Sequence, residues 1–240
     1  RLERIAMRDS FEEIHSLSIQ LLNTAISKSK YTRSDLSIAG CLPPLIASYT
    51  AEDSRENKKL FDEYVLLIEQ QIDHVDLFLV ETLSSIREII VVTDALDHFG
   101  LGKYISLTLD DDNPNLLRSG ENLVDAIKLL EMKSADAILL NCSCPETISS
   151  ALSEFKNIDI PFGAYANGFS SVKDLKFGKS VNVLEARNDL GPDEYSEFVM
   201  DWIGKGARII GGCCEIGPKH INRVSDQLHL NGYTTMKLGL

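Results

Sequence analysis

The run DAILLN at residues 136–141, followed directly by CSCPETI at residues 142–148, decides the fold class of this 240-residue chain. A short, almost wholly apolar run that leads into a helix start is typical of a parallel β-strand buried on both faces. Segments of helical period separate it from five similar runs, at residues 36–40, 76–81, 104–109, 161–166 and 207–211. This alternation predicts an α/β protein, built either as an open doubly wound sheet or as a closed barrel.

The segments between these runs predict about seven helices that pack on the sheet, because their apolar residues recur at helical spacing. The first helix is expected to begin at Ser10, where Glu13 three residues later fits a capping box. Pro192 after Gly191 predicts another helix start. The apolar stripe of the first helix consists of Phe11, Ile14, Leu17, Leu21 and Ala25.

The amino-acid composition argues against some classes of function. The net charge of −12 disfavours nucleic acid or an anionic membrane surface as a partner, because both require a basic footprint. The 44% hydrophobic content is that of an ordinary globular protein, and the length favours one domain. No apolar run has the length of a transmembrane helix or the character of a signal peptide, so we expect a cytoplasmic protein. The sequence gives no indication of its oligomeric state.

Five cysteines stand out, because three of the six predicted strands end in cysteine. In parallel α/β folds the active site lies at the carboxyl ends of the strands, so Cys41, Cys142 and the Cys213–Cys214 pair are expected at one edge of the sheet. Converging thiols in a reducing compartment favour a soft metal such as zinc over a disulfide framework. The alternative for each cysteine is a packed, inert thiol.

The segment GGCC at residues 211–214 favours the metal hypothesis. Adjacent cysteines in a regular strand point to opposite faces, so Cys213 and Cys214 share a metal only where the chain turns, and Gly211 and Gly212 are expected to permit that turn. Three thiolates leave one tetrahedral position for a substrate, as in catalytic zinc sites. A substrate thiol bound there would lose its proton and become a nucleophile.

Several segments resemble the homocysteine S-methyltransferase family, in which Gly-Gly-Cys-Cys is followed by Pro, a spacer and His. The similarity extends over nearly the whole chain, although the family's first two strands have no counterpart in the sequence. The matching segments are GGCCEIGPKHI (211–221), LLNCSCPETI (139–148), VDLFLVETL (75–83), IAGCLPP (38–44) and AYANGF (164–169).

The resemblance implies a (β/α)₈ TIM barrel without strands 1 and 2, which places residues 1–240 in one N-terminally incomplete homocysteine-binding domain. By position, Cys142, Cys213 and Cys214 match the family's zinc ligands. Glu81 matches the carboxylate that contacts the amino group of homocysteine. Asn167 matches an asparagine that approaches the metal, although Asn-Gly is also a common turn dipeptide.

The resulting hypothesis is zinc-dependent methyl transfer from a sulfonium, ammonium or related small donor to homocysteine, giving methionine. Its alternative is a catalytically incomplete barrel that binds zinc or a thiol ligand. Cys144 is expected to be a free thiol at a helix start, because a fourth protein ligand would close a catalytic site. His220 is expected to be a capping or packing residue, and 110–112 a solvated acidic loop.

Overall fold

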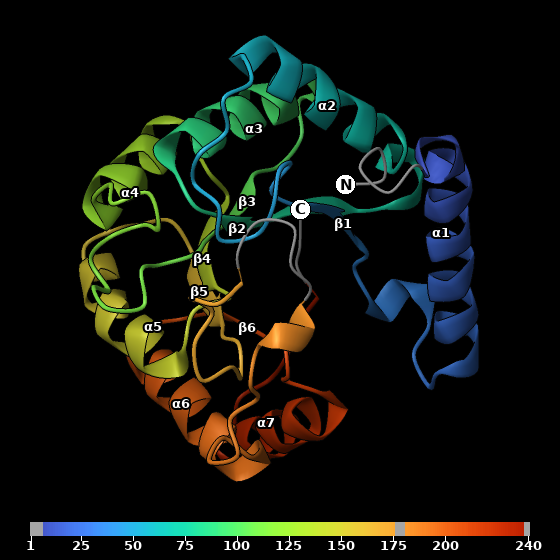
Figure 1. Ribbon diagram of the computed structural model, residues 1–240. Coiled ribbons are helices and arrows are strands. Elements are labelled where there is room, and N and C mark those ends of the chain that lie inside the picture. The colour runs from blue at the N-terminus through green and yellow to red at the C-terminus, as the bar shows by residue number, and fades with distance from the viewer. Residues whose placement is uncertain (1–6, 176–180, 238–240) are drawn as a thin grey trace.

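The computed structural model describes residues 7–175 and 181–237. Its centre is a six-stranded sheet in which every neighbouring pair is parallel and the strands lie in chain order, β1-β2-β3-β4-β5-β6. The sheet is not closed, since β1 and β6 form its two edges. Figure 1 shows the strands in the middle of the molecule, with helices α2 to α7 in an arc around them.

The six predicted strands are confirmed, with boundaries shifted by a few residues. The largest differences are at β1, which begins three residues later than predicted, and at β6, which comprises two residues. A register shift between Val80 and Leu83 interrupts the pairing of β2 with β3. The strands are β1 (Ala39–Leu42), β2 (Leu77–Leu83), β3 (Tyr104–Leu107), β4 (Ala137–Asn141), β5 (Phe162–Tyr165) and β6 (Ile209–Ile210).

Seven α-helices lie in the described residues, in agreement with the sequence. None of them is both long and apolar enough to cross a bilayer. The predicted start of α6 after Gly191 is confirmed, with Pro192 as its first residue. The helices are α1 (Phe11–Lys28), α2 (Asn57–Glu69), α3 (Ile86–Phe99), α4 (Leu123–Met132), α5 (Pro145–Ala151), α6 (Pro192–Gly204) and α7 (Pro218–Leu230).

Apolar packing occurs on both faces of the sheet. The larger cluster joins the outer face to the helices and includes the fully buried Trp202 and Phe78. The inner, concave face carries a second cluster made of Leu77, Tyr104, Ala137, Leu139 and Tyr165. Side chains alternate between the faces along each strand, so the apolar runs read from the sequence supply both clusters.

Helix α1 differs from the prediction in two respects. Ser10 is its N-cap residue, but the serine side chain makes no capping hydrogen bond, so the predicted capping box is wrong. The helix also buries none of its residues, and Leu17 and Leu21 of the predicted apolar stripe are 52% and 62% exposed. The stripe therefore does not pack on the sheet, and α1 stands at one end of the arc of helices (Figure 1).

Candidate metal and substrate site

Three cysteine side chains converge at the carboxyl edge of the sheet. The sulfur atoms of Cys142, Cys213 and Cys214 all lie within 4.8 Å of one another, and those of Cys213 and Cys214 are 4.0 Å apart. Thiolates about 2.3 Å from a tetrahedral zinc ion stand about 3.8 Å from each other, so the spacing fits one zinc ion. The set offers sulfur only, which suits a soft metal.

Cys142 reaches this cluster through an unusual backbone. It follows β4 directly and adopts the left-handed conformation, with φ of 50°. Its amide donates to the carbonyl of Tyr165 at 3.3 Å, and its carbonyl accepts from the hydroxyl of Thr108. Conformations of this kind are costly for residues other than glycine and gather at functional sites. The backbone at the end of β4 therefore directs the sulfur of Cys142 toward the other two cysteines.

The Gly-Gly-Cys-Cys segment turns as predicted, but for a different reason. Neither Gly211 nor Gly212 has a positive φ; the left-handed residue of this turn is Glu215, with φ of 65°. A Cβ atom on Gly212 would lie 2.3 Å from Cγ2 of Ile216, so this position requires glycine for space. The amide of Ile216 donates to the carbonyl of Cys213 at 3.1 Å and closes the turn.

The thiols share protons when no metal is bound. Hydrogen bonds from Cys142 and then Cys213 lower the pKa of the Cys214 thiol to about 3. Hydrogen bonds with Cys142 and then Cys214 raise the pKa of the Cys213 thiol, because the proton is held between the sulfurs. A divalent cation would displace the remaining thiol protons, so metal binding here is coupled to proton release.

Glu81 lies on the concave face of the sheet, at the end of β2. Its side chain is half-buried, and Oε2 accepts a hydrogen bond from the thiol of Cys41 on β1 at 3.0 Å. The hydroxyl of Tyr165 on β5 also interacts with this carboxylate and donates to Ser106 at 2.6 Å. Glu81 therefore reaches the concave side of the sheet as a partly accessible anion.

Asn167 follows β5 and lies between the two cysteine-bearing turns. Its backbone amide donates to the carbonyl of Ser143 at 3.1 Å, and the backbone amide of Gly168 donates to the carbonyl of Cys214 at 2.8 Å. The Asn167 side chain is 1% exposed, and its Oδ1 accepts from the amide of Phe169. Among the described residues, its Nδ2 has no hydrogen-bond partner, which leaves one buried donor at the site.

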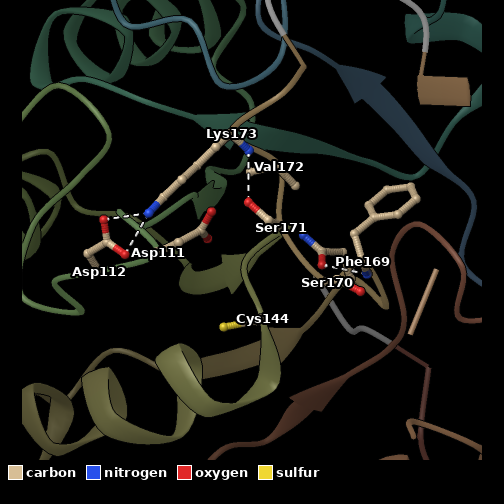
Figure 2. Close-up of a pocket in the computed structure, with 9 residues that line it drawn as sticks. Asp111, Asp112, Cys144, Phe169, Ser170, Ser171, Val172 and Lys173 are labelled. Atoms are coloured by element: carbon tan, nitrogen blue, oxygen red, sulfur yellow. Dashed lines mark hydrogen bonds and ion pairs between the residues drawn. The ribbon is translucent and has the colours of Figure 1, made fainter. Parts of the chain in front are cut away.

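A cavity of about 200 Å³ opens beside Asn167. Figure 2 shows Cys144 at the start of α5 on one side of this cavity and the ion pair between Lys173 and Asp112 on another. The lining is mixed, and Phe169 is one of its apolar members. A cavity below the usual 300–1,000 Å³ of ligand pockets suits a small polar molecule.

A family model described as homocysteine S-methyltransferase matches residues 1–228. The chain belongs to the homocysteine S-methyltransferase family. The resemblance inferred from the cysteine motif is thereby confirmed, and it accounts for strand ends that carry a Gly-Gly-Cys-Cys turn and an Asn-Cys turn side by side.

Three similar proteins illustrate the relationship. A betaine-homocysteine S-methyltransferase of Drosophila melanogaster is 30% identical over 161 residues, which cover 61% of this chain and 45% of that protein. Homocysteine S-methyltransferase 1 of Arabidopsis thaliana is 29% identical over 46% of this chain and 33% of its own length. The metallated homocysteine methyltransferase MmuM of Escherichia coli superposes with a TM-score of 0.68 at 19% identity, over 90% of this chain and 70% of MmuM. The chain spans less than half the length of the curated relatives it matches.

Cys144 is the N-cap residue of α5, and its thiol contacts the hydroxyl of Thr147 rather than the cysteine cluster. His220 accepts from the amide of Gly217 and contacts the carbonyl of Leu190, so it caps and packs as expected. The acidic loop is only partly solvated, since Asp111 forms a largely buried ion pair with Arg118.

Three residues escaped the sequence analysis. Asn141, the last residue of β4, bonds the amide and hydroxyl of Thr82 at 3.0 and 2.9 Å and so fixes the end of β2 beside Glu81. Tyr49 interacts with Cys142, and Arg118 lies against the ring of Tyr49. A polar residue ending an apolar run was a usable signal for Asn141, but nothing in the sequence distinguished the other two.

Proposed function

We propose that this chain is a zinc-dependent homocysteine S-methyltransferase that uses Cys142, Cys213 and Cys214 as its metal ligands. The observation that carries the proposal is the convergence of three sulfur atoms within 4.8 Å at the carboxyl edge of a parallel sheet. Family membership supports homocysteine as the acceptor, and the metallated form of the similar MmuM structure supports a metal.

The chemistry assigned to zinc is activation of the homocysteine thiol, whose pKa falls on coordination. The sulfur lone pair then attacks the methyl carbon of a sulfonium, ammonium or related donor. The new carbon–sulfur bond gives methionine, and the electrons of the broken bond leave with the donor, which loses one positive charge. The thiol proton is released to solvent. An onium donor needs no general acid, because its leaving group departs as a sulfide or an amine.

Glu81 is proposed to bind the amino group of homocysteine. Its carboxylate reaches the concave face, where it interacts with a thiol and a phenol, and a substrate ammonium could replace the weak donor Cys41. Asn167 is proposed to bind a substrate oxygen through Nδ2. Its Oδ1 already accepts from Phe169, so the amide is oriented as a donor and not as a metal ligand.

These assignments imply a role in methionine biosynthesis, and the three reduced thiols suit a reducing compartment such as the cytoplasm. We also propose that residues 1–240 form one homocysteine-binding domain. The open sheet is the feature that favours the alternative function, a module that binds zinc or a thiol ligand without turnover, because β1 and β6 have no strand between them in the described residues.

The test measures zinc content, homocysteine binding and methionine formation in the same reduced preparation. The proposal expects about one zinc per chain, homocysteine binding only in the zinc-loaded form, and methionine formation with S-methylmethionine, betaine or S-adenosylmethionine. Zinc and homocysteine binding without methionine from any donor would favour the binding module. A metal-free protein that binds homocysteine equally well would contradict both.

A further inference from the structure

Tyr49 lies in the connection between β1 and α2, a segment without strand or helix, yet it reaches the cysteine cluster. Its hydroxyl interacts with the thiol of Cys142, and Cys213 and Cys214 are near enough to act on it electrostatically. Its backbone is left-handed, with φ of 63°. A bulky residue held in this conformation indicates that the surrounding contacts fix the position of the ring.

Arg118 supplies one of those contacts. Its guanidinium carbon stands 4.7 Å from the centre of the Tyr49 ring, a cation–π arrangement, and its side chain is 10% exposed. Two of its nitrogens bond the carboxylate of Asp111, with a shortest distance of 2.9 Å. The buried cation is therefore paired, so it can remain charged beneath the ring.

Arg118 also contacts Cys142 indirectly, through the hydroxyl of Thr108. Its Nε donates to the hydroxyl of Thr108 at 3.1 Å, and that hydroxyl donates in turn to the carbonyl of Cys142 at 3.4 Å. One guanidinium thus touches both the tyrosine that contacts the sulfur and the threonine that contacts the backbone of the same residue.

The direction of the hydrogen bond between Tyr49 and Cys142 follows from the chemistry of the two groups. A phenol has an ordinary pKa of about 10, so near neutral pH it carries a proton that it can donate. A metal-bound thiolate has no proton to give and can only accept. With metal in place, the phenol is therefore the donor and the sulfur of Cys142 the acceptor.

A thiolate that accepts a hydrogen bond has less charge available for attack on carbon. This matters because the proposed reaction brings an activated methyl group toward several thiolates at once. Attack by Cys142 would form S-methylcysteine, break the donor's carbon–sulfur or carbon–nitrogen bond with the electrons leaving on the donor, and remove an anionic ligand from the metal.

We propose that Tyr49, held by Arg118, is a positioning residue that hydrogen-bonds to the Cys142 thiolate and protects this ligand from methylation. The proposal rests on the function assigned above, and it assigns to the β1–α2 connection a role in directing the methyl group to the substrate sulfur.

The experiment compares the Tyr49→Phe variant with the wild type, both zinc-loaded and treated with methyl iodide in the absence of homocysteine. Peptide mass spectrometry follows methylation of each cysteine with time. We expect Cys142 to be methylated about tenfold faster in Tyr49→Phe, because one hydrogen bond to a charged group is lost. Arg118→Met should give a smaller increase at the same cysteine.

Tyr64→Phe is the matched control, since the Tyr64 hydroxyl bonds the carbonyl of Pro43 at the start of the same connection and not a cysteine. It should leave the methylation rate of Cys142 unchanged. The cobalt-substituted proteins give a second readout. Loss of the hydrogen bond should move the sulfur-to-metal charge-transfer band of Tyr49→Phe to lower energy, whereas Tyr64→Phe should match the wild type.

Equal methylation of Cys142 in Tyr49→Phe and wild type, at full zinc occupancy, would overturn the proposal, as would the same acceleration in Tyr64→Phe. These outcomes are separable from failure of the proposed function. If no donor methylates homocysteine but Cys142 still depends on Tyr49 for protection, the positioning role stands without the enzymatic one.

Discussion

The carboxyl edge of the sheet has two unlike halves. In the half formed by β4, β5 and β6, Cys142 and Asn167 are buried, and Cys213 and Cys214 are half-buried. The half formed by β1 and β2 is open, since Cys41 is exposed and Glu81 is half-buried. The difference fits the proposal that the first half holds a metal and the second admits a substrate.

Replacing a cysteine in each half should give the largest contrast. Cys214→Ser is expected to weaken zinc binding by more than about 100-fold, because loss even of a group that only orients a ligand costs 10–100-fold. Cys41→Ser should keep about one zinc per chain. Competition with a chromogenic chelator measures both affinities. Similar losses in the two variants would remove the distinction between the halves.

Glu81→Gln probes the open half without removing a sulfur. Homocysteine affinity should fall by about 10–100-fold, because a hydrogen bond to a charged group contributes about 1.5–3 kcal/mol. Zinc content should be unchanged. Calorimetry with homocysteine and metal analysis of the same sample provide the check, and zinc loss in this variant would show that the carboxylate serves the metal instead.

A second carboxyl group lies near β2, at the start of α3. Burial raises the pKa of Glu88, in the first turn of α3, to about 7 from its ordinary 4.5. A raised pKa means that the folded state holds this proton, so its stabilising contribution is complete below about pH 4.5 and is lost as the pH rises through about 7.

Denaturant unfolding of wild type should therefore show the free energy of unfolding falling by up to about 3 kcal/mol between about pH 5 and pH 8 from this group. Glu88→Gln should flatten that dependence, whereas Glu81→Gln should retain it. An unchanged pH profile in Glu88→Gln would mean that the carboxyl group is as well solvated in the fold as in the unfolded chain.

Cys144→Ser should have the smallest effect. Cys144 lies two residues from Cys142 but contacts Thr147 at the start of α5, and serine can make the same hydrogen bond. Zinc stoichiometry and affinity should match those of the wild type in the chelator assay. Reduced metal content would indicate a fourth cysteine ligand and a closed, structural site.

Several features of the fold could be predicted from short stretches of sequence. The six strands and the start of α6 follow from apolar runs and from Pro192 after Gly191, since these signals depend on a few neighbouring residues. The cysteine motif was equally local. It identified the family because two glycines and two thiols in one turn have few other uses.

Some predictions were wrong because the sequence does not show which part of the fold a helix face or a turn residue will contact. The apolar stripe of α1 predicts a packed helix, but the helix lies at one end of the arc and buries none of its residues. Gly212 suggested a special backbone angle, whereas its requirement is set by Ile216, a contact that exists only after the turn has formed.

By itself, the sequence determined that strands and helices alternate, that cysteines end three of the strands, and that the chain is a homocysteine S-methyltransferase family member. Only the tertiary structure decided that Asn141 fixes the end of β2 and that Arg118 holds Tyr49 against Cys142. The physical reason is the separation along the chain of the residues that interact. Strand and turn signals arise between adjacent residues, whereas these contacts join groups 59 or more positions apart, which only the parallel sheet brings within hydrogen-bond distance.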